Sequence, residues 1–198
     1  MTESTTPTRH WSVTNVARTL ISSNALASIK TQDAILLAQR MRLCKVASGA
    51  AMFRAGDTNT NFMALVLDGE AIVESTNTGA GEAVVFNVVK AGQMIGEMGV
   101  IDNTPRSANV TASSDMMVAI LDQSAFALLI KQAPNVACGF LSCLLQGTTD
   151  RLRESNRKLH TLTAINKSLF DELEESKQNE SELAELFVST SVFGTLPR

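Results

Sequence analysis

Histidine is scarce in this chain, which has only His10 and His160 among its 198 residues. A metal site of the cupin kind needs several histidines on β-strands, and the segments predicted to be strands contain none. The sequence also lacks a G-x-S-x-G nucleophile motif, a Walker loop and a Rossmann glycine fingerprint. These absences predict a protein that is not an enzyme and has neither a metal site nor a catalytic cofactor.

Cysteine is also rare, and the odd number of three, Cys44, Cys138 and Cys143, argues against a disulfide framework. The polar segment 1–9 has no apolar stretch of the kind that a signal peptide needs. No apolar run approaches the roughly 18 residues of a membrane span. We therefore expect a cytoplasmic protein with no membrane contact.

Positive charge is not in excess, since 17 basic residues face 20 acidic ones and the pI is near 5.4. A protein that grips nucleic acid through its phosphates usually carries a basic domain or patch. The one local surplus of basic residues is short and consists of Arg151, Arg153, Arg157 and Lys158. Nucleic acid is therefore not an expected partner.

Short apolar runs alternate with turn residues between Leu43 and Asp122, a texture typical of β-strands. The predicted strands are 43–47, 51–53, 62–68, 70–75, 83–89, 94–95, 107–111 and 117–122. Eight strands at this spacing predict a mainly β fold with flanking helices, an eight-stranded antiparallel jelly-roll (double-stranded β-helix) barrel followed by a long C-terminal helix. The expected divisions are a flexible tail 1–11, N-terminal helices 12–42, the barrel 43–122, a short helix 123–133, the long helix 134–188 and a tail 189–198.

The long helix is expected to begin at Pro134, because proline suits the first turn of a helix. An apolar heptad follows, made of Leu145, Leu152, Leu159, Leu162, Leu169, Leu173, Leu183 and Phe187. This pattern predicts a coiled-coil homodimer, and the alternative is a helix that packs back on its own barrel. Basic residues dominate 150–167 and acidic ones 171–185, which leaves parallel and antiparallel pairing both open.

The segment most informative about function is 96–110, Gly-Glu-Met-Gly-Val-Ile-Asp-Asn-Thr-Pro-Arg-Ser-Ala-Asn-Val. It reads as a strand end, a one-turn helix, a tight turn and a new strand. Backbone N–H groups after Gly96 and the guanidinium of Arg106 suit a phosphate, while Glu97 suits a sugar hydroxyl. The simpler alternative is a surface ion pair between Glu97 and Arg106, worth about 0–1 kcal/mol.

This segment resembles the phosphate-binding cassette of cyclic-nucleotide-binding domains, as found in bacterial catabolite activators and in regulatory subunits of cAMP-dependent kinase. The residues that match the family pattern are Gly96, Glu97, Arg106, Ser107 and Ala108. The turn Phe-Arg-Ala-Gly-Asp at 53–57 and the pair Asp68-Gly69 also resemble family turns, so the likeness extends over about residues 20–160. The helix-turn-helix that follows in the activators is not expected, because only about 40 heptad-patterned residues follow Leu159.

The resemblance implies that Glu97 binds the ribose 2′-hydroxyl, that Arg106 binds the cyclic phosphate and that Ser107 adds a hydroxyl contact. The same resemblance implies backbone contacts from Gly96 and Met98, with Ala108 completing the motif. Residues expected to form apolar walls are Val85, Ile95 and Val110. The purine would meet Ser155 and Asn156, or Thr148 if the helix is aligned from Pro134.

The predicted function is a receptor for cAMP, in preference to cGMP, that signals through its C-terminal helix to a partner protein. Two alternatives remain open. One is a structural or interaction protein that has a degenerate pocket and oligomerises through the coiled coil. The other is a receptor that holds a different ligand, such as a cyclic dinucleotide, in the same pocket.

Overall fold

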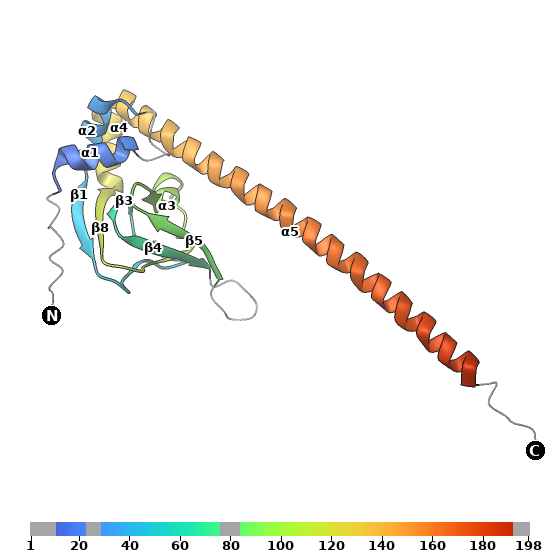
Figure 1. The fold of residues 1–198 in the computed structure, drawn as a ribbon. Helices are drawn as coiled ribbons and strands as arrows, with labels where there is room; N and C mark the ends of the chain where they lie inside the picture. The colour runs from blue at the N-terminus through green and yellow to red at the C-terminus, as the bar shows by residue number, and fades with distance from the viewer. Residues whose placement is uncertain (1–10, 23–28, 76–83, 192–198) are drawn as a thin grey trace, which may run out of the picture. The chain divides into compact units, whose positions relative to one another are not determined.

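A computed structural model describes residues 11–22, 29–75 and 84–191 of the chain (Figure 1). The chain divides into two units, Met1–Thr148 and Thr149–Arg198. No helix in the described residues is long and apolar enough to cross a membrane. The first unit holds all eight described strands, and the second holds the later part of the C-terminal helix.

The strands form two four-stranded antiparallel sheets. One sheet has the order β1 (Arg42–Val46), β8 (Met116–Asp122), β3 (Phe62–Asp68) and β6 (Met94–Ile95). The other has the order β2 (Ala51–Phe53), β7 (Asn109–Ala112), β4 (Glu70–Ser75) and β5 (Val84–Lys90). The predicted eight-stranded antiparallel jelly roll is confirmed, but the two sheets do not join into a closed barrel.

Strand β3 shows that the sheet formed by β1, β8, β3 and β6 is covered on both faces. Its residues 63–67 are all buried, although successive side chains of a strand point to opposite faces. Ala64 and Val66 belong to the core between the sheets. Met63, Leu65 and Leu67 belong to a second core that the helices share. An unbroken apolar run therefore marks a strand covered on both sides.

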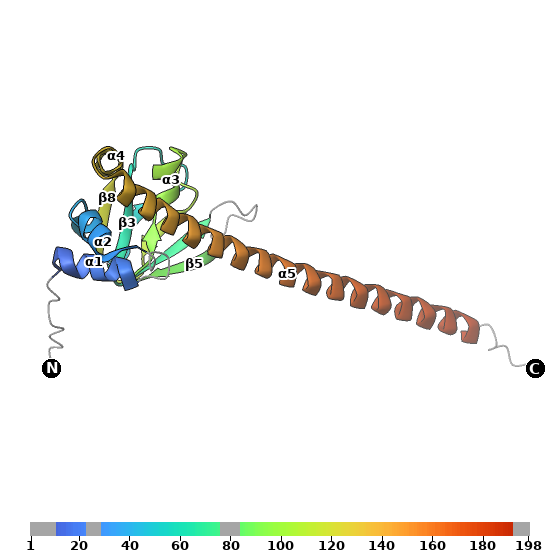
Figure 2. The same cartoon turned by 90° about the horizontal axis from the view of Figure 1, so that it is seen from above.

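The helical layer consists of α1 (Val13–Ser22), α2 (Thr31–Ala38), α4 (Gln123–Gln132) and the first turns of α5 (Pro134–Ser191). Figures 1 and 2 show α1, α2 and α4 gathered at one end of the sheets. Phe140 of α5 is fully buried and meets Phe126 of α4 edge to face, with ring centroids 5.9 Å apart. This second core fixes the start of α5 against the helical layer of its own unit.

The predicted bounds of four strands, β2, β3, β4 and β6, agree with the structure. The others differ by one or two residues, and residue 83 lies outside the described residues. Strand β7 begins at Asn109 instead of Ser107, because both backbone groups of Arg106 bond to the turn at Gly56 and Asp57. The chain can join the ladder only after leaving that turn.

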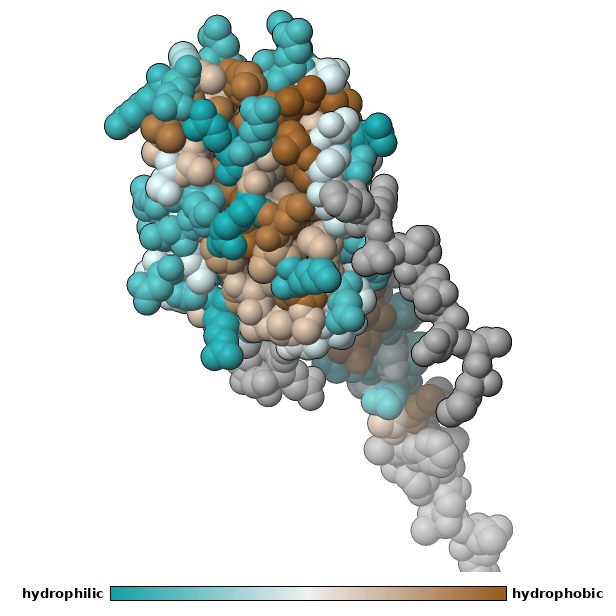
Figure 3. Space-filling view, turned by 90° about the vertical axis from the view of Figure 1, so that its left-hand side faces the viewer, coloured by the Kyte–Doolittle hydropathy of each residue, from teal (hydrophilic) through white to brown (hydrophobic). Residues whose placement is uncertain are grey.

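Strand β1 lies at the edge of its sheet and presents Arg42 and Lys45 to solvent. Figure 3 shows apolar surface running down the middle of this side of the molecule, with hydrophilic side chains around it. Charged side chains on an edge strand oppose pairing with a strand from another molecule.

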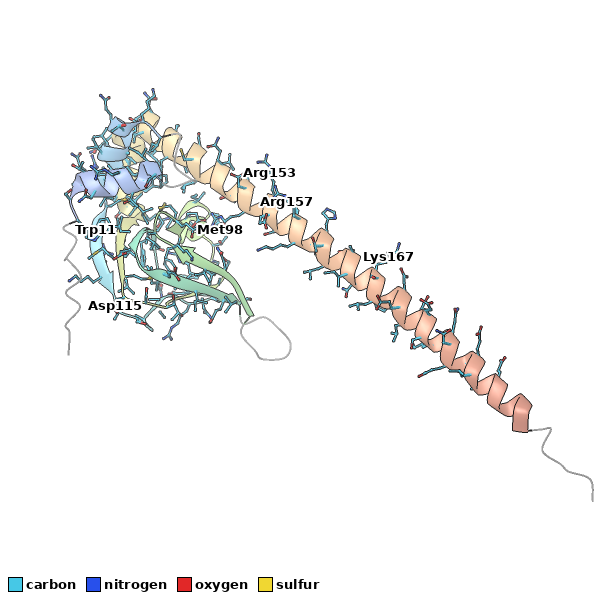
Figure 4. The ribbon with its side chains drawn as sticks, viewed as in Figure 1. Trp11, Met98, Asp115, Arg153, Arg157 and Lys167 are labelled. Atoms are coloured by element: carbon cyan, nitrogen blue, oxygen red, sulfur yellow. The ribbon has the colours of Figure 1, made fainter. Side chains whose placement is uncertain are left out.

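The described part of the second unit, residues 149–191, belongs to α5, and every side chain from 150 to 185 is exposed. Its exposed large apolar side chains are Leu152, Leu159, Leu162, Ile165, Leu169, Phe170, Leu173 and Leu183. Figure 4 shows Arg153, Arg157 and Lys167 projecting from the same helix. The apolar residues at the predicted heptad positions between 150 and 185 therefore form an exposed apolar stripe, and most of the remaining helix surface is polar or charged.

Candidate functional site

The site is built on the chain that links β6 to β7. Gly96 follows β6 and lies in the left-handed region, with φ 76°, and α3 (Glu97–Ile101) begins directly after it. A Cβ at position 96 would lie 2.5 Å from the Phe53 ring and 2.9 Å from Nη1 of Arg106. Both the backbone angle and the close approach therefore require glycine here.

A tight turn carries the chain from α3 toward Arg106. Asp102 Oδ1 accepts hydrogen bonds from Oγ1 and N of Thr104 at 2.7 and 3.0 Å, and these bonds lower the pKa of the Asp102 carboxyl. Asn103 adopts a positive φ of 56°, and its Oδ1 accepts a hydrogen bond from Nε2 of Gln123. The turn is thus held by its own side chains and is tied to the first residue of α4.

Arg106 is only 6% exposed, and its guanidinium donates to four protein oxygens. Nε donates to Thr60 Oγ1 at 2.8 Å, and Nη1 donates to the Gly96 carbonyl at 2.5 Å. Nη2 donates to the carbonyls of Thr60 and Phe62, the latter at 2.6 Å. The residue therefore joins the start of β3 to the end of β6.

The remaining surroundings of Arg106 are aromatic and anionic. Its guanidinium carbon lies 4.0 Å from the centroid of the Phe53 ring, within reach of a cation–π interaction. Burial lowers the pKa of the Arg106 guanidinium, and the negative charges of Asp57 and Glu97 oppose that change. The guanidinium stays charged in a place where water screens it poorly.

Glu97 is also buried, with 4% of its surface exposed, and it follows the glycine whose carbonyl accepts from Arg106. The structure thus brings the two predicted ligand-binding side chains to the same place. Because both are buried, the alternative of a surface ion pair is wrong.

The two motifs found in the sequence also meet. The Gly56 N–H donates to the Arg106 carbonyl at 2.8 Å, and the Arg106 N–H donates to the Asp57 carbonyl at 3.0 Å. Nearby, the Ala55 N–H donates to Oδ1 of Asn109 at 2.8 Å. The turn at 53–57 therefore fixes the backbone on which Arg106 stands.

The cassette residues that were expected to contact a ligand differ in exposure. Ser107 and Met98 are exposed, while Ala108 is half-buried (Figure 4 labels Met98 on α3). Ile95 and Val110 are buried in the core between the sheets, beside Phe53. Val85 of β5 is 51% exposed.

The predicted purine contacts, Ser155 and Asn156, are exposed and belong to the second unit. Thr148 ends the first unit, and its Oγ1 donates to the Leu144 carbonyl one turn earlier. Contacts with the base therefore stay a prediction. In the described part of the chain, no three side chains of the His, Cys, Asp or Glu types gather where they could hold a metal ion.

A family profile described as the cyclic nucleotide-binding domain matches residues 43–133. These residues, slightly less than half of the chain, therefore match the cyclic nucleotide-binding domain family. The family is regulatory rather than catalytic. The profile covers the two sheets, the segment from Gly96 to Arg106 and helix α4.

The cAMP-dependent protein kinase regulatory subunit of Eremothecium gossypii is 32% identical over 111 residues, which are 56% of this chain and 23% of that protein. The chain thus spans about a quarter of the length of this curated relative.

Two solved structures share the fold. A cyclic nucleotide-binding domain from Methylobacillus flagellatus is similar with a TM-score of 0.66 and 27% identity, covering 74% of this chain and 81% of that one. The catabolite activator protein of Thermus thermophilus is similar with a TM-score of 0.60 and 25% identity, covering 71% of this chain and 63% of that one.

The sequence contains no signal for the hydrogen-bond partners of Arg106. Thr60 and Phe62 lie more than forty residues away along the chain, and three of the four acceptors are backbone carbonyls. A backbone carbonyl leaves no signal in the residue type. The role of Phe53 was also missed, although the turn that begins with it was recognised.

Proposed function

We propose that the chain is a cyclic-nucleotide receptor that binds cAMP in preference to cGMP. The observation that supports this most directly is the joint burial of Arg106 and Glu97 next to Gly96, in the segment that matches a cyclic nucleotide-binding domain. A buried cation next to a buried acid suits a ligand that carries both an anion and a hydroxyl group.

The proposed roles follow from the chemistry of the ligand. The cyclic phosphodiester carries one negative charge, which the Arg106 guanidinium would neutralise through charge-assisted hydrogen bonds. The ribose 2′-hydroxyl would donate to the Glu97 carboxylate, while Gly96 and Met98 offer backbone groups. Ser107 is exposed and can add its hydroxyl, next to the half-buried Ala108.

The preference for cAMP is supported by the relative that is named for cAMP dependence, the kinase regulatory subunit of Eremothecium gossypii. The output is proposed to pass through α5 to a partner protein in the cytoplasm. The exposed apolar stripe of α5 supports pairing with a second copy of the chain. In that assembly Ser155 and Asn156 are the proposed contacts of the purine.

Calorimetry and thermal melts against cAMP, cGMP, 2′-deoxy-cAMP and a cyclic dinucleotide test the proposal. We expect cAMP to raise the melting temperature most, because a ligand that binds the folded state stabilises it. We also expect 2′-deoxy-cAMP to bind about tenfold more weakly, since it lacks the hydroxyl that would donate a charge-assisted hydrogen bond to the Glu97 carboxylate.

The matched pair of variants is Glu97→Gln and Glu70→Gln. Glu97→Gln should reduce the ratio of the affinities for cAMP and 2′-deoxy-cAMP from about tenfold to about threefold, because a neutral amide oxygen is a weaker acceptor than a carboxylate. Glu70 forms an exposed ion pair with Lys90, so its substitution should leave the preference unchanged. Absence of a melting shift with every nucleotide at millimolar concentration would refute the proposed function.

A second candidate function rests on a specific observation. The Arg106 guanidinium donates to four protein oxygens and therefore has a structural role that does not require a ligand. That arrangement also suits an interaction protein with a degenerate pocket, which would oligomerise through α5. Such a protein would form dimers, and its melting temperature would not change with any nucleotide in the panel.

A further inference from the structure

The hydrogen bonds of Arg106 limit how it can take a phosphate. A guanidinium has five N–H groups, one on Nε and two on each Nη. Within the described residues, four of them donate to Thr60 Oγ1 and to the carbonyls of Thr60, Phe62 and Gly96, which leaves one N–H on Nη1. Two parallel hydrogen bonds to a phosphate need two N–H groups, so at least one existing bond must break.

We propose that Thr60, Phe62 and Gly96 form a clasp on Arg106, and that a cyclic phosphate binds by exchange with this clasp. This inference rests on the proposed function. The clasp and the ligand compete for the same N–H groups, so the strength of the clasp sets the affinity for the nucleotide. Burial of the guanidinium strengthens this competition, because a buried N–H that loses its protein acceptor costs free energy unless the ligand supplies another acceptor oxygen.

Thr60 is the residue through which the clasp can be tuned. Three of the four acceptors are backbone carbonyls, which every amino acid supplies, and only the Thr60 hydroxyl comes from a side chain. No carboxylate is among the four acceptors. The neutral oxygens of the clasp therefore compete with a negatively charged phosphodiester for the N–H groups of Arg106. A neutral acceptor binds a guanidinium more weakly than an anion does, which allows the exchange to run toward the ligand.

The clasp is also connected to α4. Asn61 lies between Thr60 and Phe62, and its carbonyl accepts from the Gln123 N–H at 2.9 Å. Gln123 begins α4, and its side chain donates to Asn103 in the turn that leads to Arg106. Opening the clasp would therefore shift both anchors of the first residue of α4, which gives nucleotide exchange a physical route toward the helices.

The test compares Thr60→Val, which has nearly the same shape without the hydroxyl, with Thr60→Ser, which keeps the hydroxyl. Calorimetry with cAMP and thermal melts without nucleotide are run on the full chain. We expect Thr60→Val to lower the melting temperature and yet bind cAMP about threefold to tenfold more tightly, because the clasped form has lost one hydrogen bond. Thr60→Ser should match the parent chain in both measurements.

A clasp predicts that Thr60→Val lowers the melting temperature but tightens the binding of cAMP. A merely structural role of Thr60 predicts that the melting temperature and the affinity for cAMP both fall. If the parent chain binds cAMP and Thr60→Val binds it equally or more weakly, the clasp is overturned while the proposed function stands. If only Thr60→Val binds measurably, the clasp is supported. If neither protein binds a nucleotide, both proposals fail.

A second measurement covers the case in which Thr60→Val does not fold. The ¹H–¹⁵Nε resonance of Arg106, identified by its loss in Arg106→Lys, is followed by NMR in the parent chain during titration with cAMP. Exchange of the clasp must move this resonance and that of the Gln123 amide. If both stay fixed at saturating cAMP, the clasp proposal is wrong.

Discussion

The two parts of helix α5 differ in what they touch, although they belong to one helix. Residues 134–148 place Val136, Ala137, Phe140, Cys143 and Leu144 in the core of the first unit. From 150 to 185 every side chain is exposed, including leucines at regular spacing. The same secondary structure therefore comes from tertiary packing in one part and from helix propensity and surface ion pairs in the other.

The largest expected effect that sharpens this comparison is the loss of Phe140. Phe140→Ala removes a fully buried ring that meets Phe126, and we expect the free energy of unfolding to fall by about 3–5 kcal/mol. Urea titration followed by far-UV circular dichroism measures the change. The control on the same helix is Leu169→Ala, which at micromolar or lower concentration should cost less than about 0.5 kcal/mol. Equal losses would contradict the contrast between the two parts.

A second comparison lies within the first unit, between two glycines with similar backbone angles. Gly96 has φ 76° and a Cβ there would strike Phe53 and Arg106, whereas Gly49 has φ 81° with nothing within 4 Å. Gly96→Ala should lower the free energy of unfolding by about 3 kcal/mol, through backbone strain and the displacement of Arg106. Gly49→Ala should cost only about 1 kcal/mol, the strain alone. Thermal melts of the two variants measure the loss of stability. Similar losses for both variants would show that the close approach of Arg106 to Gly96 does not contribute to stability.

The smallest expected effect on folding comes from a substitution in the exposed apolar stripe of α5. The same substitution should have a clear effect on association. Leu162→Asp places a charge at a heptad position that is 61% exposed in the single chain. We expect the first unit to keep its stability while dimers dissociate in sedimentation velocity at about 10–100 μM, since a charge at a core position of a coiled coil is costly. Ser168→Asp adds the same charge outside the heptad core and should leave the dimer intact. A parent chain that sediments as a monomer at these concentrations would contradict pairing through α5.

The sequence predicted the elements that depend on local pattern. Strands β3 and β4 were found with their bounds because an apolar run and the Asp68-Gly69 turn mark them. The cassette was found because Gly96, Glu97 and Arg106 stand at fixed distances along the chain. The sequence did not show that the two sheets stay open toward each other, because strand pairing at the sheet edges depends on how the two layers meet and not on any one segment.

The sequence by itself determined where most strands lie, where the chain turns and which residues form a nucleotide-binding motif, since each of these follows from nearby residue types. Only the tertiary structure decided what Arg106 binds, because its acceptors are mostly backbone carbonyls brought there from residues 60 and 62. It also decided which part of α5 is buried, since burial depends on what other elements place against a helix. In the fold, the arginine that the sequence predicts to bind a phosphate is a residue that connects the start of β3 to the end of β6.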